Sequence, residues 1–206
     1  MRVKSTEMVL AVLLAAMLAM ATLPAAAVAA ATDDQEHWAA KRQWFSFRAG
    51  YAKSATADAA NGSVGGGIGY SRMLPKWKRF RNFSLGGYAH MEQLGHFGDA
   101  KEFEIPVTLE LARHFRWGPQ VHPYLGFGGG AFYRKLYRTG DDIGVMRSGR
   151  YIVLGMNSPV DGTRVLGVDV RFVKLDATNI RVNPVFGAGD NNATHWSVKL
   201  NYTLTY

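Results

Sequence analysis

Two pairs of side chains have the residue types and the spacing that hydrolytic chemistry uses. His195 and Ser197 are separated by one residue, and so are His90 and Glu92. A histidine activates a serine hydroxyl when the two groups lie within hydrogen-bond distance and an acid orients the imidazole. This spacing places both members of a pair on one face of a β-strand. The alternative, which we favour from the sequence, is that these side chains belong to a polar hydrogen-bond network inside the domain.

Other kinds of chemistry find less support. The sequence has no cysteine, which excludes thiol catalysis. Two glycine tracts, 65–67 and 128–130, lack the Lys-Ser/Thr signature of a phosphate-binding loop, and we expect them to admit bulky neighbours such as Tyr88 instead. The histidines show no recognised ligand spacing, so we predict no metal and no cofactor. The histidines in question are His90, His96, His114, His122 and His195.

The first 31 residues have the layout of a cleaved secretory signal peptide. Arg2 and Lys4 precede an apolar run over residues 8–23, and Pro24 is followed by a tract of small residues with Ala-x-Ala character. We expect residues 32–43 to form a short periplasmic segment, as a short helix or a disordered tail, with Trp38 as an anchor at the membrane interface. Residues 44–206 would then form one domain.

The basic charge of the chain does not indicate nucleic-acid binding. The formal net charge is +8, and removing Arg2, Lys4 and Glu7 leaves 22 basic and 15 acidic residues, or +7. Export makes nucleic acid an improbable partner, and anionic lipid headgroups are the expected one.

Alternation with a period of two predicts an all-β domain. The last segment alternates over twelve residues, with Trp196, Val198, Leu200, Tyr202, Leu204 and Tyr206 on one face and polar side chains on the other. The same period recurs upstream, although residues 149–157 are apolar on both faces and form the weakest case. The predicted strands are 44–52, 63–71, 83–92, 102–111, 124–133, 149–157, 166–174 and 195–206.

Eight strands of about ten residues have the length and the even number of a single-chain transmembrane barrel. We therefore predict an eight-stranded antiparallel transmembrane β-barrel after a cleaved N-terminal signal peptide. The connections 134–148 and 175–193 would be the longest outward loops, while 72–81 and 112–120 are long for periplasmic turns. The alternative is a soluble, lipocalin-like periplasmic barrel whose apolar face points inward.

The composition of the polar face favours the membrane. It carries glycine, serine and a few nearly balanced charges, which can pair inside a narrow lumen. Aromatic residues near the strand ends fit interfacial girdles. The predicted polar network of the lumen is Arg48, His90, Glu92, Glu104, Glu110, Asp169, Arg171 and Lys199.

The terminal segment 200–206, which ends in Tyr206, resembles the last strand of outer-membrane barrels. Segments 104–109, 123–130 and 166–173 resemble central strands of small barrels similar to outer-membrane proteins A, W and X. The resemblance implies an outer-membrane location and recognition of Trp196, Tyr202, Leu204 and Tyr206 by the barrel-assembly machinery. We expect the protein to be a monomer. Lipid A deacylases of similar architecture carry a His-x-Ser-Asn motif after the penultimate strand, whereas residues 173–179 contain neither histidine nor serine.

The sequence thus predicts a barrel that is not an enzyme. Its role would be membrane integrity, surface contact or passage of something small, because eight strands enclose little more than side chains. We expect Arg134, Lys135 and Arg138, in an outward loop, to bind lipopolysaccharide phosphates. A lipid A-modifying hydrolase or acyltransferase remains the enzymatic alternative.

Overall fold

The computed structural model describes residues 37–54, 62–75, 82–97, 100–118, 120–138, 141–176 and 194–206. The predicted signal peptide, residues 1–31, lies outside them. Within the described ranges, no helix combines the length and the apolar character that crossing a membrane requires.

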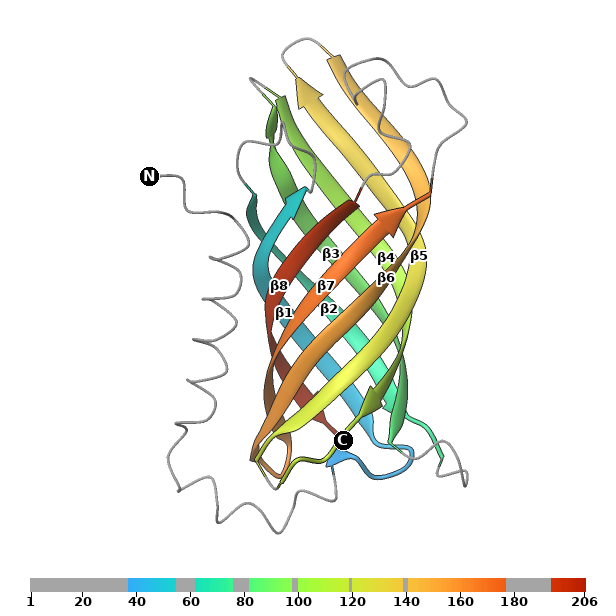
Figure 1. Cartoon of the computed structure of the whole chain (residues 1–206), viewed down its shortest axis with the longest axis vertical. Coiled ribbons are helices and arrows are strands. Elements are labelled where there is room, and N and C mark those ends of the chain that lie inside the picture. Colours follow the sequence, from blue (N-terminus) through green and yellow to red (C-terminus); the bar gives the residue numbers. More distant parts are fainter. Residues whose placement is uncertain are drawn as a thin grey trace.

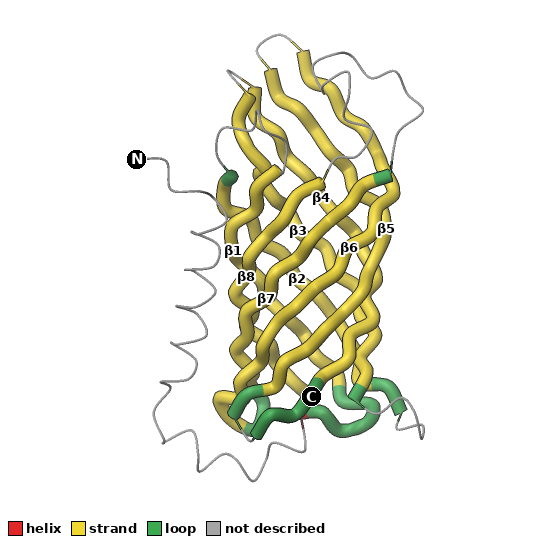
Figure 2. Tube along the Cα trace, in the orientation of Figure 1, coloured by secondary structure: helices red, strands yellow, loops and turns green. Residues whose placement is uncertain are grey.

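Eight antiparallel strands form a closed barrel, as predicted (Figure 1). Each strand pairs with the next along the chain, and β1 pairs with β8 from Trp44–Thr205 to Ser54–His195. The tilted strands surround the axis, and the C-terminus lies at the lower end of the view (Figure 2). The strands are β1 Gln43–Ser54, β2 Ser63–Met73, β3 Phe83–Phe97, β4 Ala100–His114, β5 His122–Arg138, β6 Asp141–Asp161, β7 Arg164–Leu175 and β8 Thr194–Thr205.

The apolar face of the alternation points outward. Large aliphatic and aromatic side chains are exposed on the outer wall, for example Leu109 (67 %), Phe127 (60 %) and Leu200 (64 %). The alternate positions are buried although many are charged, such as Glu104 and Asp169, both 0 % exposed. An exposed apolar belt around a polar interior is the arrangement that lipid stabilises and water does not. The alternative, a soluble lipocalin-like barrel whose apolar face points inward, is therefore not observed.

The wall formed by β3 to β6 is taller than predicted. The proposed loop 134–148 is largely strand, because β5 continues to Arg138 and β6 begins at Asp141, with Arg138 paired to Asp141. Likewise, β3 extends to Phe97 and β4 starts at Ala100. The pattern missed these extensions because residues beyond the lipid belt need no apolar face. The lower connections, 74–82 and 115–121, are indeed long.

Glycines on the inner wall make room for large rings, although not only for the predicted Tyr88. A Cβ at Gly69 would lie 2.0 Å from Cδ1 of Tyr88, and one at Gly128 would lie 2.3 Å from Cζ of Tyr151. At Gly67, the nearest ring is that of His90, 2.4 Å from the Cβ position. Because these glycines have no Cβ, the rings fit against the inner wall of the narrow barrel.

Candidate functional site

The interior holds three groups of side chains, one above another. The middle group centres on two carboxylates, Glu110 of β4 and Asp169 of β7. Arg171 Nη2 lies 2.9 Å from Glu110 Oε2, and its Nε lies 3.3 Å from Asp169 Oδ1. The hydroxyl of Tyr151 also donates to Glu110 Oε2 at 2.9 Å. One arginine therefore bridges two carboxylates that belong to different walls.

Arg48 completes the middle group from β1. Its Nη1 lies 3.8 Å from Asp169 Oδ2, and its guanidinium carbon lies 4.0 Å from the centroid of the Tyr88 ring. Asn201 Nδ2 and the Tyr124 hydroxyl also donate to Asp169 Oδ2, at 2.8 and 3.2 Å. Several donors thus offset the desolvation of this carboxylate. Together these side chains reach across the lumen, beside a cavity lined by Arg48, Tyr88, Glu110 and Tyr124.

The outer group contains a second cluster of ions. Arg134 of β5 bonds Glu102 Oε1 at 3.0 Å and Glu104 Oε2 at 2.9 Å. Lys199 of β8 bonds Glu92 Oε1 of β3. His195 Nε2 points between the carboxylates, 3.2 Å from Glu104 Oε1 and 3.8 Å from Glu92 Oε2.

Residues that precede β1 cover the end of the barrel at which the C-terminus lies. Trp38 is 1 % exposed and stacks on His122, with ring centroids 3.9 Å apart. His37 joins Thr205 Oγ1 at 2.8 Å and the carbonyl of Asp161 at 2.6 Å. The prediction that Trp38 anchors at the membrane interface is therefore wrong, because the ring is inserted into the mouth of the barrel.

The structure places all eight residues of the predicted lumen network inside the barrel. Arg48, Glu110, Asp169 and Arg171 meet in the middle group, and Glu92, Glu104 and Lys199 lie in the outer group with Arg134 and Glu102. The eighth residue, His90, is buried and its ring is parallel to that of Tyr88, with centroids 6.2 Å apart. The predicted network omitted four further inner side chains, of which Glu102, Tyr124 and Asn201 alternate with outward apolar residues, whereas Tyr151 lies in the segment that is apolar on both faces.

The position of Arg134 contradicts its predicted role in lipopolysaccharide binding. It is 4 % exposed and faces the lumen from within β5, so its assignment to an outward loop is wrong. Lys135 points to the other face, with Nζ 4.2 Å from the centroid of the Tyr137 ring. The side chain of Arg138 lies outside what the structure describes. Lipid binding by Lys135 and Arg138 stays a prediction.

The other predicted sites lie on β8. Trp196, Tyr202 and Leu204 share its outer face, and Tyr206 follows the strand and is 64 % exposed. Recognition of these residues by assembly machinery stays a prediction. On the inner face, His195 and Ser197 are both buried, but His195 Nε2 is directed to Glu104 and Glu92. Ser197 Oγ has no hydrogen-bond partner among the described residues.

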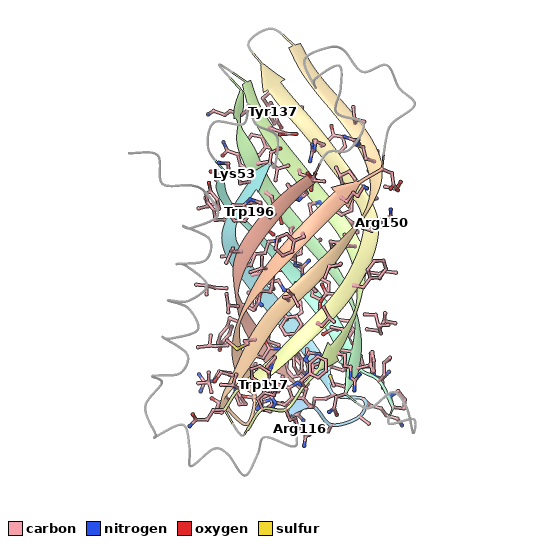
Figure 3. The ribbon with its side chains drawn as sticks, viewed as in Figure 1. Lys53, Arg116, Trp117, Tyr137, Arg150 and Trp196 are labelled. Atoms are coloured by element: carbon pink, nitrogen blue, oxygen red, sulfur yellow. The ribbon has the colours of Figure 1, made fainter. Side chains whose placement is uncertain are left out.

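Basic residues and a tryptophan lie on the outer wall near the upper end of the barrel. Figure 3 shows Lys53, Trp196 and Arg150 there, and Arg116 with Trp117 at the opposite end. Lys53 pairs with Trp196 across β1 and β8, while Arg150 pairs with Lys174 across β6 and β7. We call Lys53, Arg150, Lys174 and Trp196 the outer basic band.

No protein-family model and no curated protein matches the sequence. In fold, the chain is similar to neisserial surface protein A, with 12 % identity and a TM-score of 0.61 over 80 % of this chain and 97 % of the other. It is also similar to Ail, the attachment invasion locus protein of Yersinia pestis, with 14 % identity and a TM-score of 0.51 over 80 % and 99 %.

The resemblance to small outer-membrane barrels is thus confirmed at the level of the fold. With its apolar belt outside and its ion pairs inside, the chain has the architecture of a small eight-stranded transmembrane β-barrel.

Proposed function

We propose that this protein is a closed barrel that stabilises the outer membrane and makes contacts at its surface, and that it is not a diffusion pore. The buried ion pairs that cross the lumen carry this proposal. The middle group crosses the barrel from β1 to β4 and β7, and Trp38 occupies the periplasmic mouth. A solute would have to break buried ion pairs at one level and displace an aromatic plug at another, and both steps are costly.

Conductance across a planar lipid bilayer tests the closed lumen. The purified, folded protein should produce no stepwise openings, whereas a variant with Tyr88→Ala and Tyr151→Ala, which removes two rings from the middle group, serves as an opened control. A gel shift between unheated and boiled samples verifies that both proteins are folded. Steps in the wild-type protein as large and frequent as those of the opened variant would refute the proposal.

A second part of the proposal concerns lipid. We infer that the outer basic band, rather than Arg134, binds the phosphates of lipopolysaccharide. Arg150 and Lys174 lie directly opposite each other on a lipid-facing wall, and like charges in this position repel each other. Neither cation has an ion-pair partner in the described part of the chain, so an external anion would relieve the repulsion. Trp196 beside Lys53 suits the interfacial level at which such phosphates lie.

Thermal stabilisation by lipopolysaccharide tests the band. The midpoint of unfolding should rise when lipopolysaccharide is added to the wild-type barrel in detergent, and the rise should be largely lost in the variant Arg150→Gln with Lys174→Gln. The variant Arg113→Gln with Arg116→Gln removes the same charge at the opposite end and should keep the full rise. Equal stabilisation of both double variants would contradict this assignment. Addition of detergent-solubilised phosphatidylglycerol distinguishes lipopolysaccharide from a general anionic lipid.

A further inference from the structure

Three buried side chains from three strands point to one spot in the outer part of the lumen. They are Glu92 of β3, Glu104 of β4 and His195 of β8, and each is at most 3 % exposed. One potential ligand atom from each residue lies within 4.8 Å of the other two. His195 Nε2 is 3.2 Å from Glu104 Oε1 and 3.8 Å from Glu92 Oε2.

Each of the two carboxylates uses one oxygen to bind a buried basic side chain and leaves the other oxygen without a hydrogen bond. Glu92 gives Oε1 to Lys199, and Glu104 gives Oε2 to Arg134. The remaining oxygens, Glu92 Oε2 and Glu104 Oε1, are buried, receive no hydrogen bond, and are the two that face His195. A buried acceptor without a partner is costly, and here two of them converge. The basic residues therefore fix the carboxylates while leaving one oxygen of each free to bind something positive.

The backbone brings the two carboxylates together. Glu92 and Glu104 are direct cross-strand partners on the inner face of β3 and β4. Like charges in this position repel, more strongly away from water. The repulsion identifies the gap between them as a position where a cation is stabilised.

The charge balance of the lumen also indicates that the outer group can accommodate a further cation. The buried carboxylates among the described residues are Glu92, Glu102, Glu104, Glu110 and Asp169, and the buried arginine and lysine side chains are Arg48, Arg134, Arg171 and Lys199. Five negative groups against four positive ones leave one negative charge unmatched. In the middle group each carboxylate is bonded to arginine, asparagine or tyrosine, so the unmatched charge belongs to the outer group.

We propose that Glu92, Glu104 and His195 bind a divalent transition-metal ion such as Zn²⁺. One imidazole nitrogen and two carboxylate oxygens form a mixed ligand set that suits Zn²⁺. Ligand bonds of about 2.1 Å in a tetrahedral site separate the ligand atoms by about 3.4 Å, close to the two distances from His195 Nε2. Lys199 and Arg134 would orient the carboxylates from the second coordination shell. The competing occupant is a proton on His195, which would also neutralise the unmatched charge.

Metal titration of the folded full-length barrel distinguishes these occupants. The protein is refolded in detergent, treated with EDTA, dialysed, and titrated with Zn²⁺ in a calorimeter and with Co²⁺ in a spectrophotometer. We expect one equivalent of Zn²⁺ and a visible Co²⁺ band, with binding that weakens at lower pH because protons compete for the ligands. His195→Gln and Glu92→Gln should each weaken Zn²⁺ binding on the order of tenfold or more.

His114→Gln is the matched control, because His114 is a buried histidine at the opposite end of the barrel and should leave the stoichiometry and the affinity unchanged. The heat-dependent gel shift verifies folding of each variant, and Glu104→Gln replaces any variant that does not fold. If the folded wild-type protein binds no Zn²⁺, a proton occupies the site and the proposal is overturned. Binding that is equally tight in His195→Gln, or lost in His114→Gln, overturns it as well.

Discussion

Arg171 and Glu110 connect two walls of the barrel that are not neighbours. The guanidinium Nη2 on β7 lies 2.9 Å from Oε2 of the carboxylate on β4, and both residues are 3 % exposed. The strands β5 and β6 separate them along the wall, so the ion pair spans the interior. A narrow barrel thus uses a charged core where a soluble domain uses an apolar one.

Arg171→Met tests the importance of this ion pair. The substitution keeps a long side chain but leaves Glu110 and Asp169 without their shared cation. We expect the free energy of unfolding to fall by about 3–5 kcal/mol, the usual cost of leaving a buried charge unpaired. Unfolding in urea, followed by tryptophan fluorescence and by the heat-dependent gel shift, measures this loss.

Glu110→Gln added to Arg171→Met provides the control, because it removes the carboxylate charge that loses its ion-pair partner, while Asp169 keeps Arg48. The double variant should regain a large part of the lost stability. A loss below about 1 kcal/mol in the single variant would mean that the pair behaves like an exposed one.

Gly69→Ala should destabilise the barrel by about 1–3 kcal/mol, the range typical of overpacking. The new methyl group would lie 2.0 Å from Cδ1 of Tyr88, and Arg48 on the ring of Tyr88 restricts its escape. Gly87→Ala is the matched control, because its nearest neighbour would be Leu109 Cδ2 at 3.7 Å. Urea midpoints of the two variants give the comparison, and equal midpoints would argue against close packing at Tyr88.

The sequence predicted the fold well, because its main signal is the alternation that lipid imposes. Where a strand leaves the lipid, as β6 does between Asp141 and Ser148, the alternation loses its apolar members and the strand was missed. The sequence predicted which residues face the lumen but not which of them contact one another. Alternation gives the face of a strand on which a side chain lies, but not its position along the barrel axis. The convergence of His195 with Glu92 and Glu104 depends on register around the closed barrel, which no local spacing contains. The position of Trp38 was predicted wrongly for a similar reason, because its stacking partner His122 is distant in the sequence.

Trp38→Ala should lower the free energy of unfolding by about 3–5 kcal/mol, because the ring is buried against His122 and Trp44 and its removal leaves a cavity. Trp117→Ala removes the same ring where it is 77 % exposed, and should change stability by less than about 0.5 kcal/mol. Urea unfolding of both variants checks this difference. If Trp38→Ala proves as stable as Trp117→Ala, the plug is not packed into the mouth.

Asp161 makes stability depend on pH at the turn between β6 and β7, outside the apolar belt. Desolvation is the largest single influence on the pKa of Asp161 and raises it, but the hydrogen bonds from Thr163 and Arg164 together outweigh it and hold the pKa below its ordinary value. A carboxyl with a lowered pKa in the folded state stabilises the fold above the pKa of the unfolded chain, and that contribution is lost as the pH falls through the folded pKa. Asp161→Asn should therefore be slightly less stable than the wild type at pH 6, and the difference should diminish as the pH falls below the ordinary pKa of aspartate. Paired urea midpoints at several pH values measure this difference in stability.

Because the turn is exposed, the difference is expected to be small and to shrink with added salt. A difference that is constant across this pH range would show that the carboxylate charge does not stabilise the turn.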